Sequence, residues 1–168
     1  MADIHEIVVI GSGPGGYAAA FRAADLGMNV TLIDKDLALG GVCLNRGCIP
    51  SKSLLHISKI INESKEASKI GLNYNKPELD IEKINLWKNS TIKKLSDGIL
   101  SLAKARKVKV INGSAKFLSA TELLIKNESD SVKIKFKNCI IATGSRSTNL
   151  PKIEPNNKNI LSSKDALK

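Results

Sequence analysis

Hydrophobic positions near the N-terminus follow the periods of two strands and one helix. Ile7–Ile10 is a continuous apolar run, typical of a buried parallel strand, and we expect that strand to span Ile4–Ile10. A helix is expected from about Pro14 to Leu26, and its alanines make one face small enough to lie close to a sheet. A second strand is expected over Asn29–Asp34. Strand, glycine turn, helix and strand make a βαβ unit, so the pattern predicts an α/β fold with a parallel sheet.

The central part of the chain has the spacing of two helices. Apolar residues in Ser53–Ile70 recur at helical intervals. Gly71–Glu78, which contains two asparagines and a proline, is expected to be a loop. A longer helix is expected over Ile81–Arg106, with a weak point at Gly98 because glycine lowers helix stability.

From Val108 onwards the apolar period changes to that of short strands. We expect a small meander of four strands followed by a fifth apolar strand, over Val108–Ile111, Ala115–Leu118, Leu123–Lys126, Val132–Phe136 and Asn138–Ala142. Pro151–Asn159 is expected to be a polar loop, and Ser162 or Ser163 can cap a last short helix.

Composition and size fit one globular domain. The chain has 168 residues, of which 42% are hydrophobic, enough to bury a real core. A formal net charge of +10 suggests nucleic-acid binding, but only 4% of the residues are aromatic, which leaves little for base stacking. The lysines are spread without a dense run over Lys59–Lys69, Lys83–Lys94, Lys104–Lys109 and Lys126–Lys137. A lysine-rich solvated surface is therefore favoured and no nucleic-acid partner is expected, while an acidic partner stays open.

The expected compartment follows from segments that the sequence lacks. No stretch approaches the roughly 18 apolar residues that a membrane span requires, so no membrane partner is expected. Met1–Glu6 lacks the basic and apolar regions of a signal peptide. We therefore expect a reducing cytoplasm, where two close cysteines are more often catalytic or metal-binding than structural.

A glycine-rich loop joins the first expected strand to the first expected helix. Gly11, Gly13 and Gly16 fit the pattern G-x-G-x-x-G. The first glycine permits a tight turn, the second lets a pyrophosphate approach the backbone, and the third allows close packing of helix and strand. Asp34 ends the second strand, eighteen residues after Gly16, where its carboxylate can accept hydrogen bonds from a ribose diol. The loop predicts dinucleotide binding, and a merely structural tight turn is the alternative.

Cys43 and Cys48 leave several chemical interpretations open. A zinc site would need more ligands, and the chain offers only three further candidates without the usual spacing, which are Cys139, His5 and His56. A structural disulfide, or a pair of inert buried thiols, is disfavoured in a reducing compartment. A redox-active pair is therefore the favoured interpretation, and no metal is expected.

Geometry and charge support a redox pair. In a regular helix, two positions five apart lie roughly 8 Å apart along the axis, which is too far for a disulfide. The chain between Cys43 and Cys48 must therefore bend, and Gly47 gives it the freedom to do so. A nearby helix N-terminus and Lys52 would lower the pKa of a thiol and make it reactive. Cys139, inside an apolar strand, is expected to be a buried small residue.

The cysteine segment also resembles that of a known family. Gly40–Lys52 reads GGVCLNRGCIPSK and resembles the redox segment of the pyridine nucleotide–disulfide oxidoreductases, with Leu44 and Ser51 typical of their dihydrolipoamide dehydrogenase branch. The resemblance covers essentially the whole chain, because three further segments match the family's usual order, namely Lys94–Ile99, Gly113–Phe117 and Ile141–Ser145. The alternatives are a related glutathione-type or mercuric reductase and a non-catalytic flavin-binding module.

The resemblance implies a Rossmann-like FAD-binding domain, with FAD as the bound dinucleotide and NAD as co-substrate. The residues that it assigns to the cofactor are Gly11, Ser12, Gly13, Pro14, Gly15, Gly16, Asp34, Lys35, Gly41, Val42, Cys43, Cys48, Lys52, Ala115, Thr143 and Gly144. The glycine loop would hold the pyrophosphate, Asp34 the adenosine ribose, and the backbone near Ala115 the adenine. Thr143 and Gly144 would belong to a second flavin-binding segment, and Lys52 would lie near the reactive edge of the flavin.

The resemblance also implies a reaction and partners. Cys48 would lie against the flavin and form a charge-transfer pair as thiolate, while Cys43 would exchange with a small-molecule or lipoyl-domain dithiol. Electrons would pass from dihydrolipoamide to the disulfide, then to FAD and then to NAD. The implied partners of the full-length enzyme are 2-oxoacid dehydrogenase complexes and a second copy of the chain, as a homodimer.

The sequence departs from the family at two positions and in length. Asp34 stands where family members usually have glutamate, and Ser147 stands where a proline is common. Family members continue far beyond Lys168, with nicotinamide and interface domains and a histidine–glutamate pair that moves protons. His5 and His56 match neither member of that pair, and we expect a surface residue and an ordinary helix residue, respectively.

The length sets the expected domain organisation. We expect an N-terminal portion of the enzyme that is inactive alone. Residues 1–150 would form the first segment of the FAD-binding domain, with the redox-active helix at 40–70. Residues 151–168 would be a linker and the start of the next element.

Overall fold

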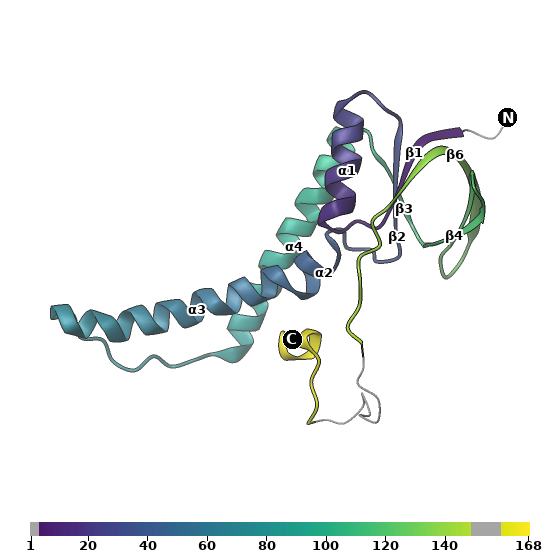
Figure 1. Ribbon diagram of the computed structural model, residues 1–168. Coiled ribbons are helices and arrows are strands. Elements are labelled where there is room, and N and C mark those ends of the chain that lie inside the picture. Colours follow the sequence, from purple (N-terminus) through teal and green to yellow (C-terminus); the bar gives the residue numbers. More distant parts are fainter. Residues whose placement is uncertain (1–3, 149–158) are drawn as a thin grey trace.

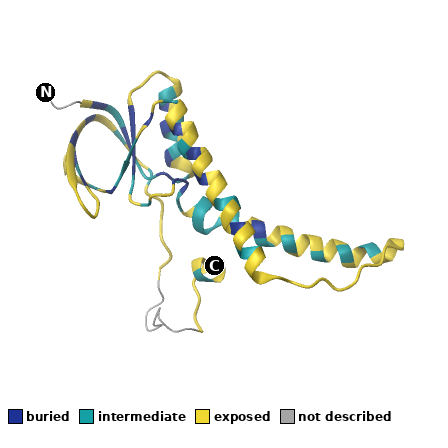
Figure 2. Ribbon diagram, turned by 180° about the vertical axis from the view of Figure 1, so that it is seen from behind, coloured by how far each residue is buried: buried dark blue, intermediate teal, exposed yellow. Residues whose placement is uncertain are grey.

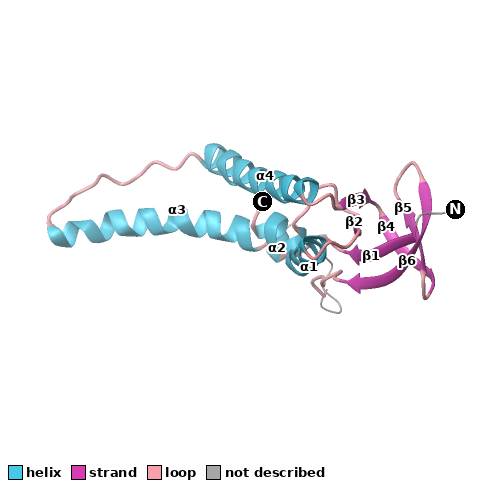
Figure 3. Cartoon of the chain, turned by 90° about the horizontal axis from the view of Figure 1, so that it is seen from above, coloured by secondary structure: helices cyan, strands magenta, loops and turns pink. Residues whose placement is uncertain are grey.

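The computed structural model describes residues 4–148 and 159–168 of the chain. The body is a six-stranded mixed sheet with helices packed on one face, and a long helical arm extends away from it (Figure 1). Seen from above, the arm consists of two helices that leave the body next to one another (Figure 3). The predicted α/β fold with its parallel βαβ unit is confirmed.

The sheet has the strand order β3-β2-β1-β6-β5-β4. The strands are β1 (Ile4–Ile10), β2 (Val30–Asp34), β3 (Lys109–Asn112), β4 (Ser114–Ser119), β5 (Glu122–Lys126) and β6 (Ser131–Ile141). β1 pairs in parallel with β2 and β6, and β2 pairs in parallel with β3. β5 lies antiparallel between β4 and β6, so β6 joins the parallel half of the sheet to the antiparallel half.

Two features of the strands differ from the sequence prediction. The run Val108–Ile111, predicted as the start of the meander, contributes to β3, which pairs in parallel with β2 at the edge of the sheet. The runs Val132–Phe136 and Asn138–Ala142, predicted as two strands, belong to the single strand β6. Polar Lys137 and Asn138 do not break β6, because this strand changes its pairing from β5 to β1 along its length and stays extended throughout.

The helices follow the predicted order with one shifted boundary. They are α1 (Pro14–Asp25), α2 (Gly41–Arg46), α3 (Cys48–Glu66), the 3-10 helix η1 (Ala67–Ile70), α4 (Ile81–Ala105) and α5 (Ser163–Ala166). The helix predicted from Ser53 begins earlier, at Cys48. The predicted cap of the last helix is confirmed, because the Ser162 hydroxyl accepts a hydrogen bond from the backbone N–H of Asp165. Residues 151–158 of the predicted polar loop lie outside the described residues.

Hydrophobic residues form one core cluster on each face of the sheet. Val8 and Val9 are neighbours on β1 and are fully buried in different clusters, which explains the continuous apolar run Ile7–Ile10. The cluster beneath α1 and α4 includes Val9, Ala20, Val30, Leu32, Ile99 and Ala103. The other cluster lies where β5 and β6 curl over the sheet (Figure 1), and it includes Val8, Ile33, Leu123, Ile125, Ile134 and Phe136. These two cores fix the carboxyl ends of β1 and β2.

The arm, formed by the outer parts of α3 and α4 and the segment between them, is largely exposed (Figure 2). Large apolar side chains that are open to solvent along it include Leu55, Ile60, Leu72, Leu86 and Trp87. None of the helices within residues 4–148 and 159–168 is long and apolar enough to cross a membrane.

Two residues that were expected at the surface are buried. His5 is 7% exposed, and its Nδ1 lies 2.7 Å from the hydroxyl oxygen of Thr31 on β2. Lys88 is only 2% exposed, although it belongs to a stretch predicted to be solvated. Its ammonium donates to the carbonyl oxygens of Leu167 and Lys168. Both expectations are wrong because Thr31, Leu167 and Lys168 are distant in sequence from the residues that they contact, and no local pattern indicates these contacts.

Candidate functional site

Cys43 and Cys48 form a disulfide at the junction of α2 and α3. Their Cα atoms are 4.8 Å apart, much closer than five residues of one continuous helix would allow. The predicted bend is therefore present, and it lies at Gly47 between the two helices. A Cβ atom at Gly47 would lie 3.2 Å from the carbonyl oxygen of Val42, so a side chain would crowd the turn that brings the sulfurs together.

The disulfide segment packs on the glycine loop. The backbone N–H of Gly40 donates to the carbonyl oxygen of Ser12 at 3.0 Å. Gly41 has a φ of +61°, and a Cβ atom added to it would lie 2.7 Å from the Cα of Gly13. The two segments can approach this closely because Gly41 has no side chain. The fold therefore brings the two sequence motifs together at the N-terminus of α1.

The glycine loop has the shape of an anion-binding site. Cβ atoms at Gly11 and Gly16 would lie 2.4 Å from the carbonyl oxygen of Ala142 and 1.7 Å from that of Gly11, so neither position has room for a side chain. Gly13, in contrast, faces open space. Ser12 is fully buried, and its hydroxyl has no hydrogen-bond partner among the described residues. An open backbone and an unpaired hydroxyl at a helix N-terminus fit a phosphate group.

Asp34 is fixed by the backbone on both sides. One carboxylate oxygen accepts from the N–H of Ser12 at 2.6 Å, and the other accepts from the N–H of Asp36 at 2.9 Å. Asn112 on β3 holds the same turn by donating to the carbonyl oxygens of Asp34 and Lys35, both at 3.1 Å. Each carboxylate oxygen has a second lone pair, so the group can still accept hydrogen bonds from a ligand.

A cavity of about 230 Å³ opens beside Asp34, at the carboxyl ends of β1 and β2. Its lining includes five residues that the sequence analysis assigned to the cofactor, namely Gly11, Asp34, Lys35, Ala115 and Thr143. Ile10, Ile33, Gly113 and Ser114 complete the lining. Ligands of α/β sheets bind at this edge of the strands. The cavity and the glycine loop therefore make one candidate site for a nucleoside and its phosphates.

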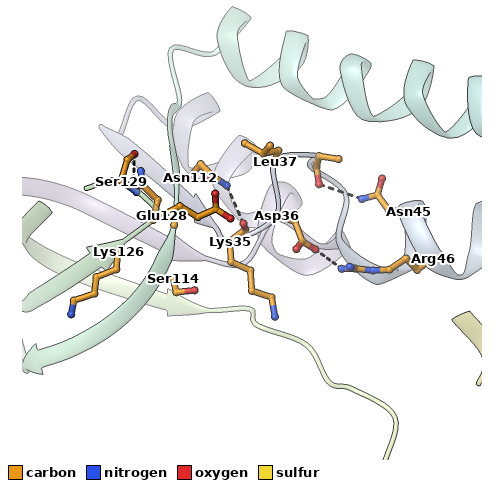
Figure 4. Close-up of a pocket in the computed structure, with 13 residues that line it drawn as sticks. Lys35, Asp36, Leu37, Asn45, Arg46, Asn112, Ser114, Lys126, Glu128 and Ser129 are labelled. Carbon is orange, nitrogen blue, oxygen red and sulfur yellow. Dashed lines mark hydrogen bonds and ion pairs between the residues drawn. The ribbon is translucent and has the colours of Figure 1, made fainter. Parts of the chain in front are cut away.

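A larger cavity of about 810 Å³ borders the first one, and both are lined by Lys35, Gly113 and Ser114. Figure 4 shows charged side chains of both signs around it, including Lys35, Asp36, Arg46, Lys126 and Glu128. Asp36 and Arg46 form an ion pair that connects the turn after β2 to the end of α2. This pair links the cavity to the redox disulfide, because Arg46 lies between the two cysteines.

Two residues enclosed by the disulfide hold its segment in place, and the sequence analysis gave neither of them a role. Asn45 donates through Nδ2, at 3.1 to 3.3 Å, to the carbonyl oxygens of Ala38, Leu39 and Gly41. Ser96 on α4 donates to the carbonyl oxygen of Leu39 at 2.9 Å, so the same turn is also tied to α4. Arg46 contributes the ion pair described above. The sequence signal that could have indicated these roles was the position of Asn45 and Arg46 between the two cysteines.

Several residues assigned to the cofactor lie outside both cavities. Val42 and Lys52 are exposed on α2 and α3, and Gly144 lies in the segment after β6 with a φ of +66°. Pro14 and Gly15 form the first turn of α1. Their role in cofactor binding stays a prediction.

The remaining sulfur and imidazole groups stand apart from the disulfide. Cys139 lies on β6, is partly buried and packs against the core cluster on the β5–β6 side. Burial raises the pKa of its thiol, which disfavours a reactive thiolate. His56 is exposed on α3, with its ring 6.2 Å from that of Trp87. Within the described part of the chain, no three His, Cys, Asp or Glu side chains gather in a way that could hold a metal ion.

Comparison with known sequences gives a consistent result. Residues 5–168 match the family model described as pyridine nucleotide-disulphide oxidoreductase. The chain is 51% identical over 162 residues to the dihydrolipoyl dehydrogenase of Buchnera aphidicola subsp. Schizaphis graminum, and 46% identical over 162 residues to that of Vibrio parahaemolyticus. Both alignments cover 96% of this chain and 34% of the relative. The chain thus spans about a third of the length of the curated relatives it matches.

Comparison with solved structures agrees on the fold. The Cu(II) complex of RclA, an HOCl-induced flavoprotein disulfide reductase from Escherichia coli, matches with a TM-score of 0.82. The match covers 98% of this chain and 34% of that one, at 24% sequence identity. At this identity the likeness supports the fold alone, and it confirms the predicted Rossmann-like architecture.

Proposed function

Because the chain belongs to the pyridine nucleotide-disulphide oxidoreductase family, we propose that it contains the FAD-binding and redox-disulfide part of a dihydrolipoyl dehydrogenase. The observation that supports this most strongly is the contact of the disulfide segment with the glycine loop, where Gly41 lies against Gly13. Family membership implies FAD and NAD as the cofactors. A nucleotide-binding module without redox chemistry would need no cysteine pair at this position.

The residues present fit FAD in their chemistry. The positive end of α1, the open backbone at Gly13 and Gly15, and the Ser12 hydroxyl, which has no partner among the described residues, would hold the pyrophosphate. Asp34 would accept hydrogen bonds from the adenosine ribose, and the backbone at Ala115 would line the adenine end of the cavity. The other proposed contacts are Lys35 and Thr143, which line the same cavity, and Gly41, Val42, Lys52 and Gly144.

The disulfide would exchange with a dithiol substrate. A substrate thiolate attacks the Sγ atom of Cys43, the Cys43–Cys48 bond breaks, and Cys48 leaves as a thiolate. The second substrate thiol then loses its proton and attacks the mixed disulfide, which releases the oxidised substrate and leaves both cysteines reduced. FAD, when bound, supplies the route by which this electron pair reaches NAD. Cys48 is the first residue of α3, where the positive end of the helix stabilises a thiolate.

The substrate and partners follow from the same proposal. We assign a lipoyl-domain or small-molecule dithiol as the substrate, 2-oxoacid dehydrogenase complexes as the assemblies served, and a cytoplasmic homodimer as the full-length form. The name dihydrolipoyl dehydrogenase of the curated relatives supports the dithiol substrate. We further assign residues 1–150 to the FAD-binding domain and 151–168 to a linker and the start of the next element.

Absorption spectroscopy tests the cofactor and the role of each cysteine. The chain is mixed with FAD, freed of unbound FAD by gel filtration, and reduced by two electrons. We expect a bound-flavin spectrum that gains a long-wavelength charge-transfer band. Cys48→Ser should bind flavin without the band, Cys43→Ser should show the band even before reduction, and the control Cys139→Ser should behave as the parent. Bound flavin without any band in the parent would contradict the assignment of Cys48, and no bound flavin would contradict the cofactor site.

A further inference from the structure

We propose that Asp36 and Arg46 are a positioning pair, which keeps Cys43 and Cys48 in the geometry of the disulfide when the disulfide is reduced. The proposal rests on the redox function proposed above. Arg46 is the last residue of α2 and lies inside the loop closed by the disulfide. Its guanidinium is paired with the Asp36 carboxylate across the edge of the larger cavity (Figure 4).

Asp36 is held in place in the turn that follows β2. Its backbone N–H donates to Asp34, and Asp34 in turn accepts from the backbone of Ser12 in the glycine loop. The side chains of Asp36 and Arg46 are about one-third exposed, at 32% and 33%. They are therefore less screened by water than the helical pairs of this chain, such as Lys59–Glu63, whose side chains are 70% and 64% exposed.

The segment Cys43–Cys48 needs such an anchor once its disulfide is reduced. α2 has only six residues, which is too short for a helix to be stable by itself. Reduction removes the bond between α2 and α3, and Gly47 between them leaves the backbone free to swing. Asn45 holds the start of α2, and Arg46 holds its end. When both ends of α2 are held, the two thiols stay close, and this favours re-formation of the disulfide over the open dithiol.

The proposal predicts how the thiol–disulfide equilibrium changes. Dithiothreitol reduces the chain without FAD: the Cys43–Cys48 bond breaks, two electrons and two protons pass to the cysteines, and dithiothreitol closes to its cyclic disulfide. We expect Arg46→Met and Asp36→Asn each to raise the equilibrium constant for reduction by about 3- to 10-fold, where tenfold corresponds to about 30 mV. The double variant should show no larger shift than either single variant, because both remove one interaction.

Arg106→Met is the matched control. Arg106 pairs with Asp25 at 2.9 Å, with side chains 31% and 46% exposed, and this pair connects the ends of α4 and α1 away from the disulfide. The control should lower the thermal midpoint without shifting the redox equilibrium. Circular dichroism of each variant verifies that it is folded, and the nearly isosteric Asp36→Asn alone is sufficient for the test if Arg46→Met does not fold.

Two results would overturn the proposal. The first is that the variants fold but their equilibrium constants stay within about twofold of the parent, which would show that the ion pair does not influence the positions of the two thiols. Shifts of opposite sign for Arg46→Met and Asp36→Asn would show that the guanidinium acts by its charge on the thiolates. Because the assay contains no FAD, a chain that fails to bind flavin still gives a result, so failure of the proposed function is seen separately.

Discussion

At the scale of single residues, the site depends on places where a side chain is missing. Gly41 lies against Gly13 with a left-handed backbone, and Gly16 has no space for a Cβ beside the carbonyl of Gly11. In the proposed enzyme these contacts set how far the disulfide lies from the nucleotide. A methyl group is therefore enough to separate the two motifs.

Gly41→Ala should weaken both stability and flavin binding. The new Cβ would lie 2.7 Å from the Cα of Gly13, and the residue would keep a φ of +61°, so we expect a loss of about 1–3 kcal/mol in the free energy of unfolding. Gly98→Ala is the control, because nothing lies within 4 Å of its Cβ and it should stabilise α4 by about 0.5–1 kcal/mol. Urea unfolding and FAD titration measure both effects. Equal stability of Gly41→Ala and the parent would contradict the tight contact.

Residues with local chemistry could be predicted from the sequence, and residues with distant partners could not. The roles of Cys43, Cys48 and the glycines of the loop could be predicted from their spacing along the sequence. His5 and Lys88 are buried by partners far along the chain, which their neighbours in sequence do not indicate. Arg46 belongs to the second kind, because its partner Asp36 lies on another element and only the fold brings them together.

At the scale of elements, the hydrophobic period was sufficient to tell helices from strands, but it did not indicate which strands pair with one another. The apolar run now seen as β3 was recognised as a strand, yet it pairs with β2, and sequence order alone suggested the neighbouring meander. β6 was divided into two because polar residues interrupt its pattern, although one strand serves two partners. The bend at Gly47 was expected from the cysteine spacing, but the start of α3 at Cys48 was missed because the apolar helical period begins only after Ser53.

The N-cap of α4 should make the stability of the arm depend on pH. Asp80 accepts from the backbone N–H of Lys83 at 3.0 Å and pairs with the Lys83 ammonium, and these hydrogen bonds lower the pKa of Asp80. Because the folded state has the lower pKa, the stabilisation is present above the unfolded pKa of about 3.9 and is lost as the pH falls through the folded value. Asp80→Asn still caps the helix but does not titrate, so its thermal midpoint should fall less than that of the parent between about pH 5 and about pH 3. Circular dichroism measures both thermal midpoints. Equal falls in the parent and in Asp80→Asn would show that Asp80 does not contribute to acid sensitivity.

At the scale of the whole molecule, a packed body bears an arm whose apolar side chains are open to solvent. Leu55 and Leu86 are 66% and 69% exposed on α3 and α4, and exposed apolar groups of this kind favour association.

We expect sedimentation velocity to show concentration-dependent self-association of the chain. Leu55→Glu and Leu86→Glu should reduce it at little cost to folding, because both side chains are already hydrated. Leu26→Glu, which changes a 58% exposed leucine at the end of α1 on the body, should leave the association unchanged. A parent chain that sediments as a monomer at every concentration, or a Leu26→Glu effect as large as that of the arm variants, would show that the arm is not the associating surface.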